Sequence, residues 1–265
     1  MNSIFPGVHR GISNTEYHAD SAISKSKLWN MRKSPAYFKW AIENKQKQTD
    51  SMAFGSAVHT LFLEPENFDL EYIEYQGGDR RGKEWESFKS KHEHKTIMKT
   101  SELEPVFDCV ASIQHHKPII HGGEIELTAA WIDQETGILC KCRPDVAHQG
   151  LLIDMKTTSS IDANDFARDA VRYGYDLQAF MYCEGIHRAT GERPSVFYFL
   201  VVENTAPYLS AIMRAPIEMM ASGEVKFRKY MRTLANCIEK DSWPGPEYFY
   251  IDGQDSILIN WPSWA

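Results

Sequence analysis

The sequence predicts an α/β (α+β) fold in which helices flank a mixed central β-sheet. Three short segments of alternating polarity follow one another between residues 124 and 157, joined by turn residues, and two more lie between residues 196 and 214. Segments with apolar residues at helical spacing precede, separate and follow these groups. Elements in this order pack helices against a sheet. The 265 residues, of which 43% are hydrophobic, suffice for one large domain.

The N-terminal quarter is expected to hold an irregular lead-in and three helices. Residues 1–20 show no regular pattern. A helix is predicted to begin at Ser24 or Ser26, either of which can cap it, and Pro35 is expected to divide it into two short helices. Residues 51–64 carry apolar side chains at helical spacing and are predicted to form a buried helix.

A strand, a loop and two helices are expected next. Residues 68–75 alternate like a strand, and residues 77–82 have the glycines of a loop. Residues 83–94 are predicted to form a charged, exposed helix. Residues 101–117 are predicted to form an amphipathic helix.

The predicted sheet begins with an antiparallel meander of three strands, at residues 124–133, 138–147 and 151–157. A helix divided at Gly174 is expected to follow, and Asp162 or Asn164 can cap its start. Two neighbouring strands and one long amphipathic helix complete the body, at residues 196–203, 208–214 and 217–240.

The chain is expected to form one domain in three parts, without a linker. Residues 1–50 are the lead-in and first helices, and residues 51–240 are the core. Residues 241–265 form a tail rich in Trp and Pro. This tail is expected to dock on the body or on another subunit.

Composition argues against a membrane-spanning chain and a disulfide scaffold. No run of about 18 apolar residues is present, and the N-terminus lacks the pattern of a secretory signal. Five cysteines, an odd number, indicate free thiols in a reducing compartment, so a cytoplasmic location is expected. The net charge of −7 does not exclude nucleic acid as a ligand, because local basic patches govern phosphate binding.

A carboxylate and an ammonium project together from the third predicted strand. Asp154 and Lys156 are two residues apart, so they lie on one face of that strand. By the same alternation, Lys141, Arg143 and Asp145 share one face of the preceding strand. The short turn between the strands allows Asp145 to lie close to Asp154. Ionised groups on a mostly buried strand need partners or a metal ion.

Two acids with a nearby lysine suit metal-assisted hydrolysis of a phosphodiester. Mg²⁺ prefers oxygen ligands and keeps several waters. Such ions activate an attacking water and neutralise the leaving oxygen. The lysine can orient that water or stabilise charge on the phosphate. From these residues alone, a structural Asp154–Lys156 ion pair explains the pattern equally well.

Further polar groups lie at positions that could complete a site. His59 is on a helix predicted to be buried, where a histidine is more often a satisfied core residue than a metal ligand. Gln178 and Tyr182 are one turn apart on one helical face. Glu124 and Glu126 lie on the first strand. Either could add a carboxylate, and a solvated strand face explains both.

Taken together, these segments resemble the RecB-type branch of the PD-(D/E)xK nucleases. The N-terminal signature of that branch is similar to Ser24-x-Ser26-x-Leu28 with Ser34-Pro35-x-x-Phe38. The remaining motifs are, in order, Gly55-x3-His59, Arg143-Pro144-Asp145, Asp154-x-Lys156-Thr157 and Gln178-x3-Tyr182. Within the branch, the chain most resembles nuclease domains of the exonuclease VIII (RecE) type, which implies a restriction-endonuclease-like core.

The resemblance implies roles for individual residues. The metal ligands would be His59, Asp145, Asp154 and the backbone carbonyl of Met155. The catalytic group would comprise Lys156, the two aspartates and the supporting residues Gln178 and Tyr182.

The resemblance also implies an activity and partners. It implies a processive, ATP-independent exonuclease that uses Mg²⁺, with Mn²⁺ as a substitute, and degrades the 5′-ended strand of linear duplex DNA. The 3′ tails would serve recombination in a prophage system through a single-strand-annealing protein. A ring-shaped homotetramer is implied as well. Such domains follow a long N-terminal region, so whether Met1 is a native start is left open.

Three local patterns suggest other ligands. Residues 77–84 nearly match a phosphate-binding loop, but Glu84 stands where a hydroxyl must bind magnesium, so no ATP site is expected. Arg80, Arg81 and Lys83 are instead candidate contacts to a DNA backbone, or simply solvated charges. Cys140-x-Cys142 lacks the spacing of a zinc site. Only Cys237 lies near the C-terminus, so no iron–sulfur cluster is expected.

Two other classes of function are open from the sequence. A DNA-binding scaffold with a degenerate nuclease fold would lack an acid or the lysine, and this chain has both. A metal-dependent hydrolase of a small phosphate ester would have a compact pocket in place of a basic approach groove.

Overall fold

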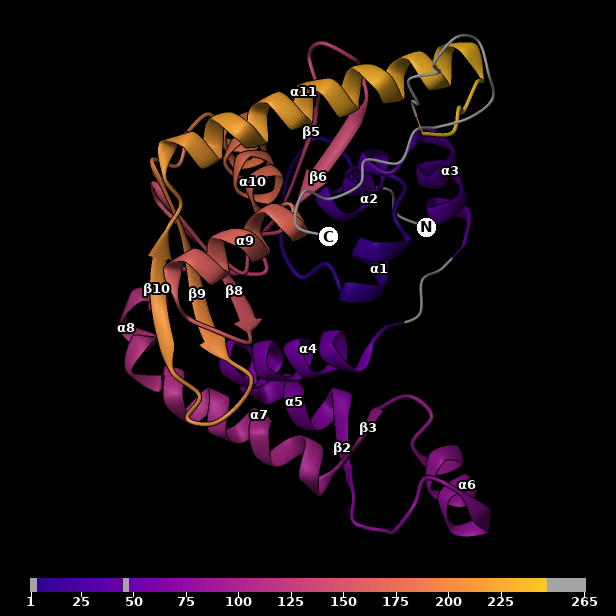
Figure 1. The fold of residues 1–265 in the computed structure, drawn as a ribbon, viewed down its shortest axis with the longest axis vertical. Helices are drawn as coiled ribbons and strands as arrows, with labels where there is room; N and C mark the ends of the chain where they lie inside the picture. Colours follow the sequence, from indigo (N-terminus) through magenta and orange to yellow (C-terminus); the bar gives the residue numbers. More distant parts are fainter. Residues whose placement is uncertain (1–3, 45–47, 247–265) are drawn as a thin grey trace, which may run out of the picture.

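A mixed five-stranded sheet lies at the centre of the computed structural model, which describes residues 4–44 and 48–246 (Figure 1). Strands β8 and β9 are parallel, and the other neighbours are antiparallel. This arrangement, with helices on both faces, confirms the predicted fold class. In spatial order the strands are β10 (Ser210–Arg214), β9 (Val196–Glu203), β8 (Leu151–Thr158), β7 (Val146–His148) and β4 (Glu124–Ile125).

Helices from two parts of the chain cover the two faces of this sheet. One face packs against α4 (Asp50–Leu63) and α7 (Thr100–Ile113), whose apolar side chains meet Ile153 and Met155 of β8. Leu152, which precedes Ile153, belongs to the core on the other face. That face is covered by α9 (Ala163–Tyr173), α10 (Tyr175–Thr190) and α11 (Ile217–Lys240).

The predicted meander is wrong in its topology, because two of its three strands are broken. Residues 124–133 divide into β4 and β5 (Thr128–Ile132), and residues 138–147 divide into β6 (Leu139–Cys142) and β7. Strands β5 and β6 belong to a second sheet, of order β1-β5-β6. The first break follows from the left-handed backbone of Glu126 (φ 54°). The second contains Pro144, which has no N–H to donate to a ladder.

The N-terminal lead-in has regular structure, contrary to expectation. Strand β1 (Gly7–His9) pairs with β5, and helix α1 (Asn14–Ala19) follows it. Ser13 caps α1 by accepting a hydrogen bond from the Glu16 N–H, while the Glu16 carboxylate accepts one from the Ser13 N–H. This reciprocal cap fixes a helix too short to show periodicity.

Two predicted helix breaks are confirmed. Ser24 caps α2 (Lys25–Trp29), which continues as a 3-10 turn, η1 (Asn30–Arg32), and ends before α3 (Pro35–Glu43). Gly174 separates α9 from α10 with a left-handed backbone (φ 68°). A Cβ at this position would lie 2.7 Å from the Trp29 ring, so both the conformation and the space require glycine.

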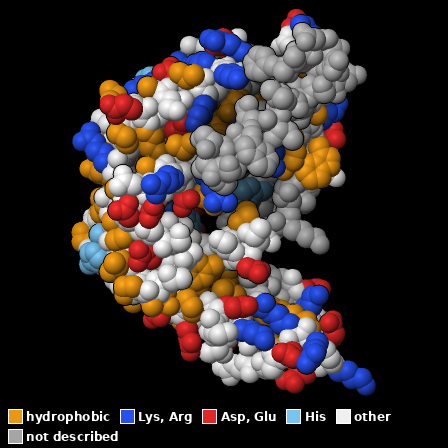
Figure 2. All heavy atoms as spheres, viewed as in Figure 1, with side chains coloured by type: hydrophobic (Ala, Val, Ile, Leu, Met, Phe, Trp, Pro, Cys, Tyr) orange, Lys and Arg blue, Asp and Glu red, His pale blue; other side chains and the backbone are white. Residues whose placement is uncertain are grey.

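An arm projects from the body between α4 and α7 (Figures 1 and 2). Its two parallel strands, β2 (Tyr72–Tyr75) and β3 (Thr96–Lys99), carry α6 (Gly82–Lys91) between them. The predicted strand at 68–75 is wrong in its first half, since α5 (Pro65–Glu71) occupies it. Pro65 at the first position of α5 favours a helix start. The arm bears basic and acidic side chains close to one another (Figure 2).

Other predicted features end or fall outside these elements. The helix predicted at 101–117 stops at Ile113, after which η2 (Gln114–His116) and α8 (Lys117–Ile120) follow. Residues 247–265, most of the predicted docking tail, lie outside the described residues. All five cysteines are free and buried. Within the described ranges, no helix has both the length and the hydropathy needed to cross a membrane.

Candidate metal centre

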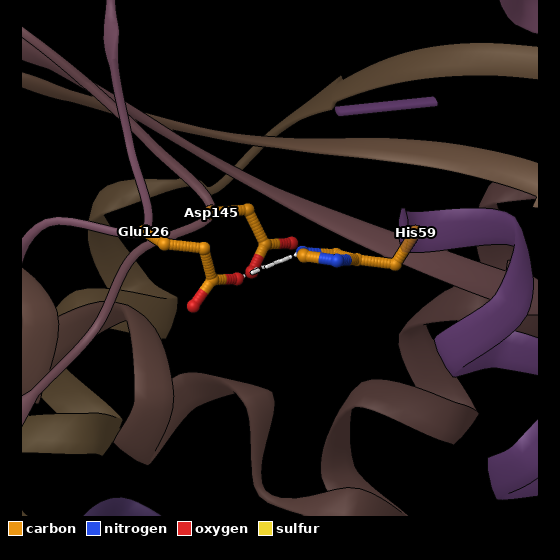
Figure 3. Close-up of side chains that lie close together, drawn as sticks. All are labelled: His59, Glu126 and Asp145. Atoms are coloured by element: carbon orange, nitrogen blue, oxygen red, sulfur yellow. Dashed lines mark ion pairs between the residues drawn. The ribbon is translucent and has the colours of Figure 1, made fainter. Parts of the chain in front are cut away.

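Three side chains from distant parts of the chain converge at the seam between the two sheets (Figure 3). His59 Nε2 lies 3.1 Å from Glu126 Oε1 and 3.2 Å from Asp145 Oδ1. One ligand atom from each of the three residues lies within 4.8 Å of the other two. Among the described residues, this is the set of histidine, cysteine and acidic groups close enough to share one metal ion.

Helix α4 brings His59 to the centre because it lies unusually close to β8. A Cβ on Gly55 would lie 3.2 Å from Thr157 Oγ1, a tighter contact than side chains normally accept. Val58, next to His59, is fully buried in the core between α4 and the sheet. The spacing Gly55-x3-His59 therefore combines a close helix–strand contact with a histidine one turn later.

Glu126 belongs to the centre, and Glu124 does not. Glu124 pairs with Ala147 at the edge strand and forms an ion pair with Arg10. Glu126 follows β4 in the left-handed conformation, held by a hydrogen bond of 3.1 Å from its N–H to the Asp145 carbonyl. Such a conformation in a non-glycine residue costs about 1–3 kcal/mol and is concentrated at functional sites. It turns the Glu126 carboxylate toward His59 (Figure 3).

Asp145 links the triad to strand β8. Its second oxygen, Oδ2, accepts a hydrogen bond from the backbone N–H of Met155. Burial opposes a charge on His59, but Asp145 and Glu126 outweigh burial and raise the pKa of His59 well above its ordinary value. Burial likewise opposes ionisation of Asp145, yet His59 holds the pKa of its carboxyl below the usual value. The two carboxylates thus favour the protonated, positively charged form of the His59 imidazole.

Asp154 and Lys156 lie beside the triad as a pair. Asp154 is buried, and its Oδ1 accepts a hydrogen bond of 2.6 Å from Gln178 Nε2, while its Oδ2 pairs with Lys156 Nζ. Burial and the Asp145 carboxylate raise the pKa of Asp154 to about 6. The predicted convergence of Asp145 with Asp154 and Lys156 is thus present, and Gln178 joins them. Asp154 itself is not part of the three-ligand cluster.

The donor set fits a divalent cation of the magnesium or manganese kind. Two carboxylate oxygens and one imidazole nitrogen face a common point, and Mn²⁺ accepts both kinds of donor. Two partly buried carboxylates sharing one histidine leave negative charge that a cation would neutralise. The Met155 carbonyl, implied as a further ligand by resemblance, is on the backbone whose N–H already contacts Asp145.

Arg143 and Lys141 do not share a strand face with Asp145, contrary to the prediction. The strand ends at Cys142, so the alternation does not continue to Asp145. Lys141 is buried and pairs with Asp20, while the Arg143 guanidinium lies 4.1 Å from the Tyr17 ring centre. Both basic side chains therefore hold the N-terminal segment.

Arg143 nevertheless contacts the centre, through the side of Glu126 that faces away from His59. Its Nη1 lies 3.4 Å from Glu126 Oε2, the oxygen that does not face His59. The same guanidinium donates to Thr128 Oγ1, to Asn14 Oδ1 and to the Ile12 carbonyl. Arg143 thus fixes Glu126 relative to the N-terminal segment. Sequence reasoning missed this contact because nothing local indicates that residues 12–14 lie next to Arg143.

Of the remaining predicted residues, Tyr182 lies near the candidate centre, and the three basic residues lie on the arm. Tyr182 is one turn after Gln178, and burial together with the Asp154 carboxylate raises the pKa of its phenol well above the usual range. Arg80, on the arm, pairs with Glu102 at the start of α7, and Arg81 pairs with Asp79. Lys83 is exposed at the start of α6, away from the sheet (Figure 1).

Comparison with known proteins agrees with this architecture. Residues 24–248 match the model of a family described as "PDDEXK-like domain of unknown function (DUF3799)". The chain belongs to this family. The matched range contains every residue of the candidate centre, from His59 to Gln178. A search of curated proteins finds no match.

The solved structures that match this PDDEXK-like chain share little of its sequence. The crystal structure of a protein from Eubacterium rectale named "Putative exonuclease" has a TM-score of 0.61 and 14% identity, covering 96% of this chain and 95% of that one. This likeness shows a shared fold. A phage-related exonuclease from Haemophilus somnus 129PT has a TM-score of 0.35 and 13% identity, covering 83% of this chain and 96% of that one.

Proposed function

We propose that this protein is a divalent-metal-dependent nuclease that hydrolyses phosphodiester bonds of linear duplex DNA. The observation that carries the proposal is the His59–Glu126–Asp145 cluster beside the Asp154–Lys156 pair, in a chain of the PDDEXK-like family. His59, Glu126 and Asp145 would hold the cation, and Asp154 would complete its surroundings. When bound, Mg²⁺ would supply Lewis-acid activation of water and charge neutralisation.

The protein side chains would position and stabilise the reacting phosphate. The Lys156 side chain is 18% exposed and its ammonium pairs with Asp154, so Lys156 would offer a held positive charge to a phosphate oxygen. Gln178 orients Asp154 by donating a hydrogen bond to Oδ1, the carboxylate oxygen that does not pair with Lys156. The pKa of Asp154, about 6, leaves this carboxylate mostly ionised at neutral pH, as its pairing with Lys156 requires. Catalysis then rests on preorganised charge around the phosphate.

The finer part of the proposal concerns the reaction course. We propose an ATP-independent exonuclease that uses Mg²⁺, degrades the 5′-ended strand and leaves a 3′ tail for a single-strand-annealing partner, as part of a homotetrameric ring. The motif resemblance to exonuclease VIII-type domains supports this proposal. The printed name of the solved structure with a TM-score of 0.61, "Putative exonuclease", is in line with an exonuclease activity.

The direct test is digestion of linear duplex DNA labelled at the 5′ or the 3′ end, with Mg²⁺ or EDTA. The wild type is compared with Asp154→Ala and Lys156→Ala. We expect loss of the 5′-ended strand only with Mg²⁺, and a fall of at least about a hundredfold in either variant, because each loses a charge next to the phosphate. Closed circular DNA should survive if the activity needs an end.

A matched control is Glu124→Gln, which removes an acid of the same segment outside the centre. Full activity in EDTA, or an unaffected Asp154→Ala protein, would contradict the mechanism. Cleavage of a nucleotide monophosphate but not of duplex DNA would identify a small-molecule phosphoesterase instead.

A further inference from the structure

Lys25 lies next to the candidate centre, in a corner formed by Trp29, Tyr173 and Tyr175. This lysine begins α2, and its Nζ donates a hydrogen bond of 2.7 Å to the Tyr173 carbonyl at the end of α9. The ammonium also lies 5.6 Å from the ring centre of Tyr175 and 5.8 Å from that of Trp29. Lys156 Nζ is 5.0 Å from the same Tyr175 ring centre. Tyr175 therefore stands between two ammonium groups.

The corner holds Lys25 in place. Trp29 packs on Gly174, where any Cβ would meet its ring at 2.7 Å. Tyr175 packs against Phe166 and Phe199, with ring centres 5.8 Å and 5.7 Å apart. The aromatic side chains thus fix the distance between α2 and the start of α10, and with it the position of Lys25 relative to Lys156.

Lys25 is a partly buried cation whose charge is not matched by a carboxylate. Among the described residues, no carboxylate oxygen lies within 4.0 Å of Lys25 Nζ, the distance that defines an ion pair. Lys226, which also approaches Trp29, does pair with Asp176. Burial and the charge of Lys156 lower the pKa of Lys25 to about 7. An anion bound at this place would oppose both effects and use the remaining N–H donors.

The corner opens to solvent on the side of Tyr173, which is 44% exposed. Because the Lys25 and Lys156 ammonium groups lie 5.6 Å and 5.0 Å from the same Tyr175 ring centre, a strand whose scissile phosphate contacts Lys156 could bring a neighbouring phosphate to this corner. A chain of diesters is the anion that brings a second charge to a fixed spacing from the first.

We propose that Lys25 binds a backbone phosphate next to the scissile one, so that Lys25 and Lys156 hold two successive positions of the cleaved strand. This inference rests on the proposed function, which places the scissile phosphate at Lys156. It assigns to the N-terminal helix α2 a direct contact with substrate. Lys25 would be a binding residue, acting on the register of the strand.

The test is binding of linear duplex DNA in EDTA, measured by fluorescence anisotropy, for the wild type, Lys25→Met, Lys25→Gln and Lys25→Arg. We expect the first two variants to lose about tenfold in affinity, as for one charged hydrogen bond. In these two variants, the slope of log affinity against log salt concentration should fall by about one, which corresponds to one released counterion fewer. Lys25→Arg should bind nearly as the wild type does. Lys33→Met, at an exposed lysine after α2, is the charge-matched control.

A set of duplexes with a single uncharged methylphosphonate at successive positions locates the contact. One position should weaken the wild type but have no further effect on Lys25→Met or Lys25→Gln. Folding of each variant is checked by thermal melting, and two replacements are made so that the result does not depend on one of them. Equal affinity of a folded variant and the wild type, or the same penalty at every position, would overturn the proposal.

Binding and cleavage separate this inference from the proposed function. A wild type that binds but does not cleave DNA with Mg²⁺ would contradict the proposed function and leave the Lys25 result standing. Cleavage by the wild type without any effect of Lys25 would contradict this inference alone.

Discussion

At the scale of single residues, surroundings distinguish two acids that look alike in sequence. Glu124 and Glu126 are two residues apart and would share one face of a continuous strand. The left-handed backbone of Glu126 ends that strand and turns its carboxylate to His59, while Glu124 stays on the edge with Arg10. Sequence alternation cannot choose between them, because the choice depends on a single φ angle.

Replacement of each acid tests this distinction. We expect Glu126→Gln to weaken Mn²⁺ binding by at least about tenfold, the size of effect typical for lost groups around a protein metal. Glu124→Gln should bind Mn²⁺ as the wild type does, since it loses only an exposed ion pair. Isothermal titration calorimetry measures both. Equal affinities of the two variants would show that Glu126 is not a ligand.

At the scale of elements, two breaks in the strands bring Glu126 and Asp145 to the candidate centre. The sequence predicted where most helices and strands lie, including the divisions at Pro35 and Gly174, because proline and glycine act locally. It missed the two sheets, since the alternation continues through Glu126 and through Arg143-Pro144-Asp145 although the strands do not. Pairing with the N-terminal strand β1 is a long-range contact, and no local pattern reports it.

Arg143 joins one of these breaks to the N-terminal segment, and its loss should be felt in both. We expect Arg143→Met to lower the free energy of unfolding by about 2–4 kcal/mol, because several buried hydrogen-bond partners lose their donor. The segment before Asp20 should become sensitive to limited proteolysis, and Mn²⁺ affinity should fall as Glu126 loses its rear contact.

The control for Arg143 is Arg10→Met, at an exposed arginine of the same segment. This variant should keep both its stability and its resistance to protease, because its ion pair with Glu124 is on the surface. If Arg143→Met were as stable and as protease-resistant as Arg10→Met, the guanidinium would not hold the segment.

At the scale of the whole molecule, the centre depends on both helical layers. His59 comes from α4 on one face of the sheet, and Gln178 comes from α10 on the other. Glu126 and Asp145 come from the seam between the two sheets. A cation held there binds only when all of these parts are in place, so metal binding and the folded state are linked.

This linkage predicts that Mn²⁺ or Mg²⁺ raises the temperature of unfolding. At one hundred times the dissociation constant, a ligand of the native state adds about 2.7 kcal/mol to the free energy of unfolding. Thermal melting of the wild type should shift upward with metal, and His59→Ala should show a smaller shift at equal metal concentration. Glu124→Gln should keep the full shift. A wild type that melts at the same temperature with and without saturating metal would contradict the linkage.

The central claim is that His59, Glu126 and Asp145 hold the cation. The measurement that tests it most directly is diffraction from crystals soaked in Mn²⁺, recorded where manganese scatters anomalously. We expect an anomalous peak in contact with Nε2 of His59 and one oxygen each of Glu126 and Asp145. A peak bound by other residues, with these three side chains still paired to one another, would contradict it.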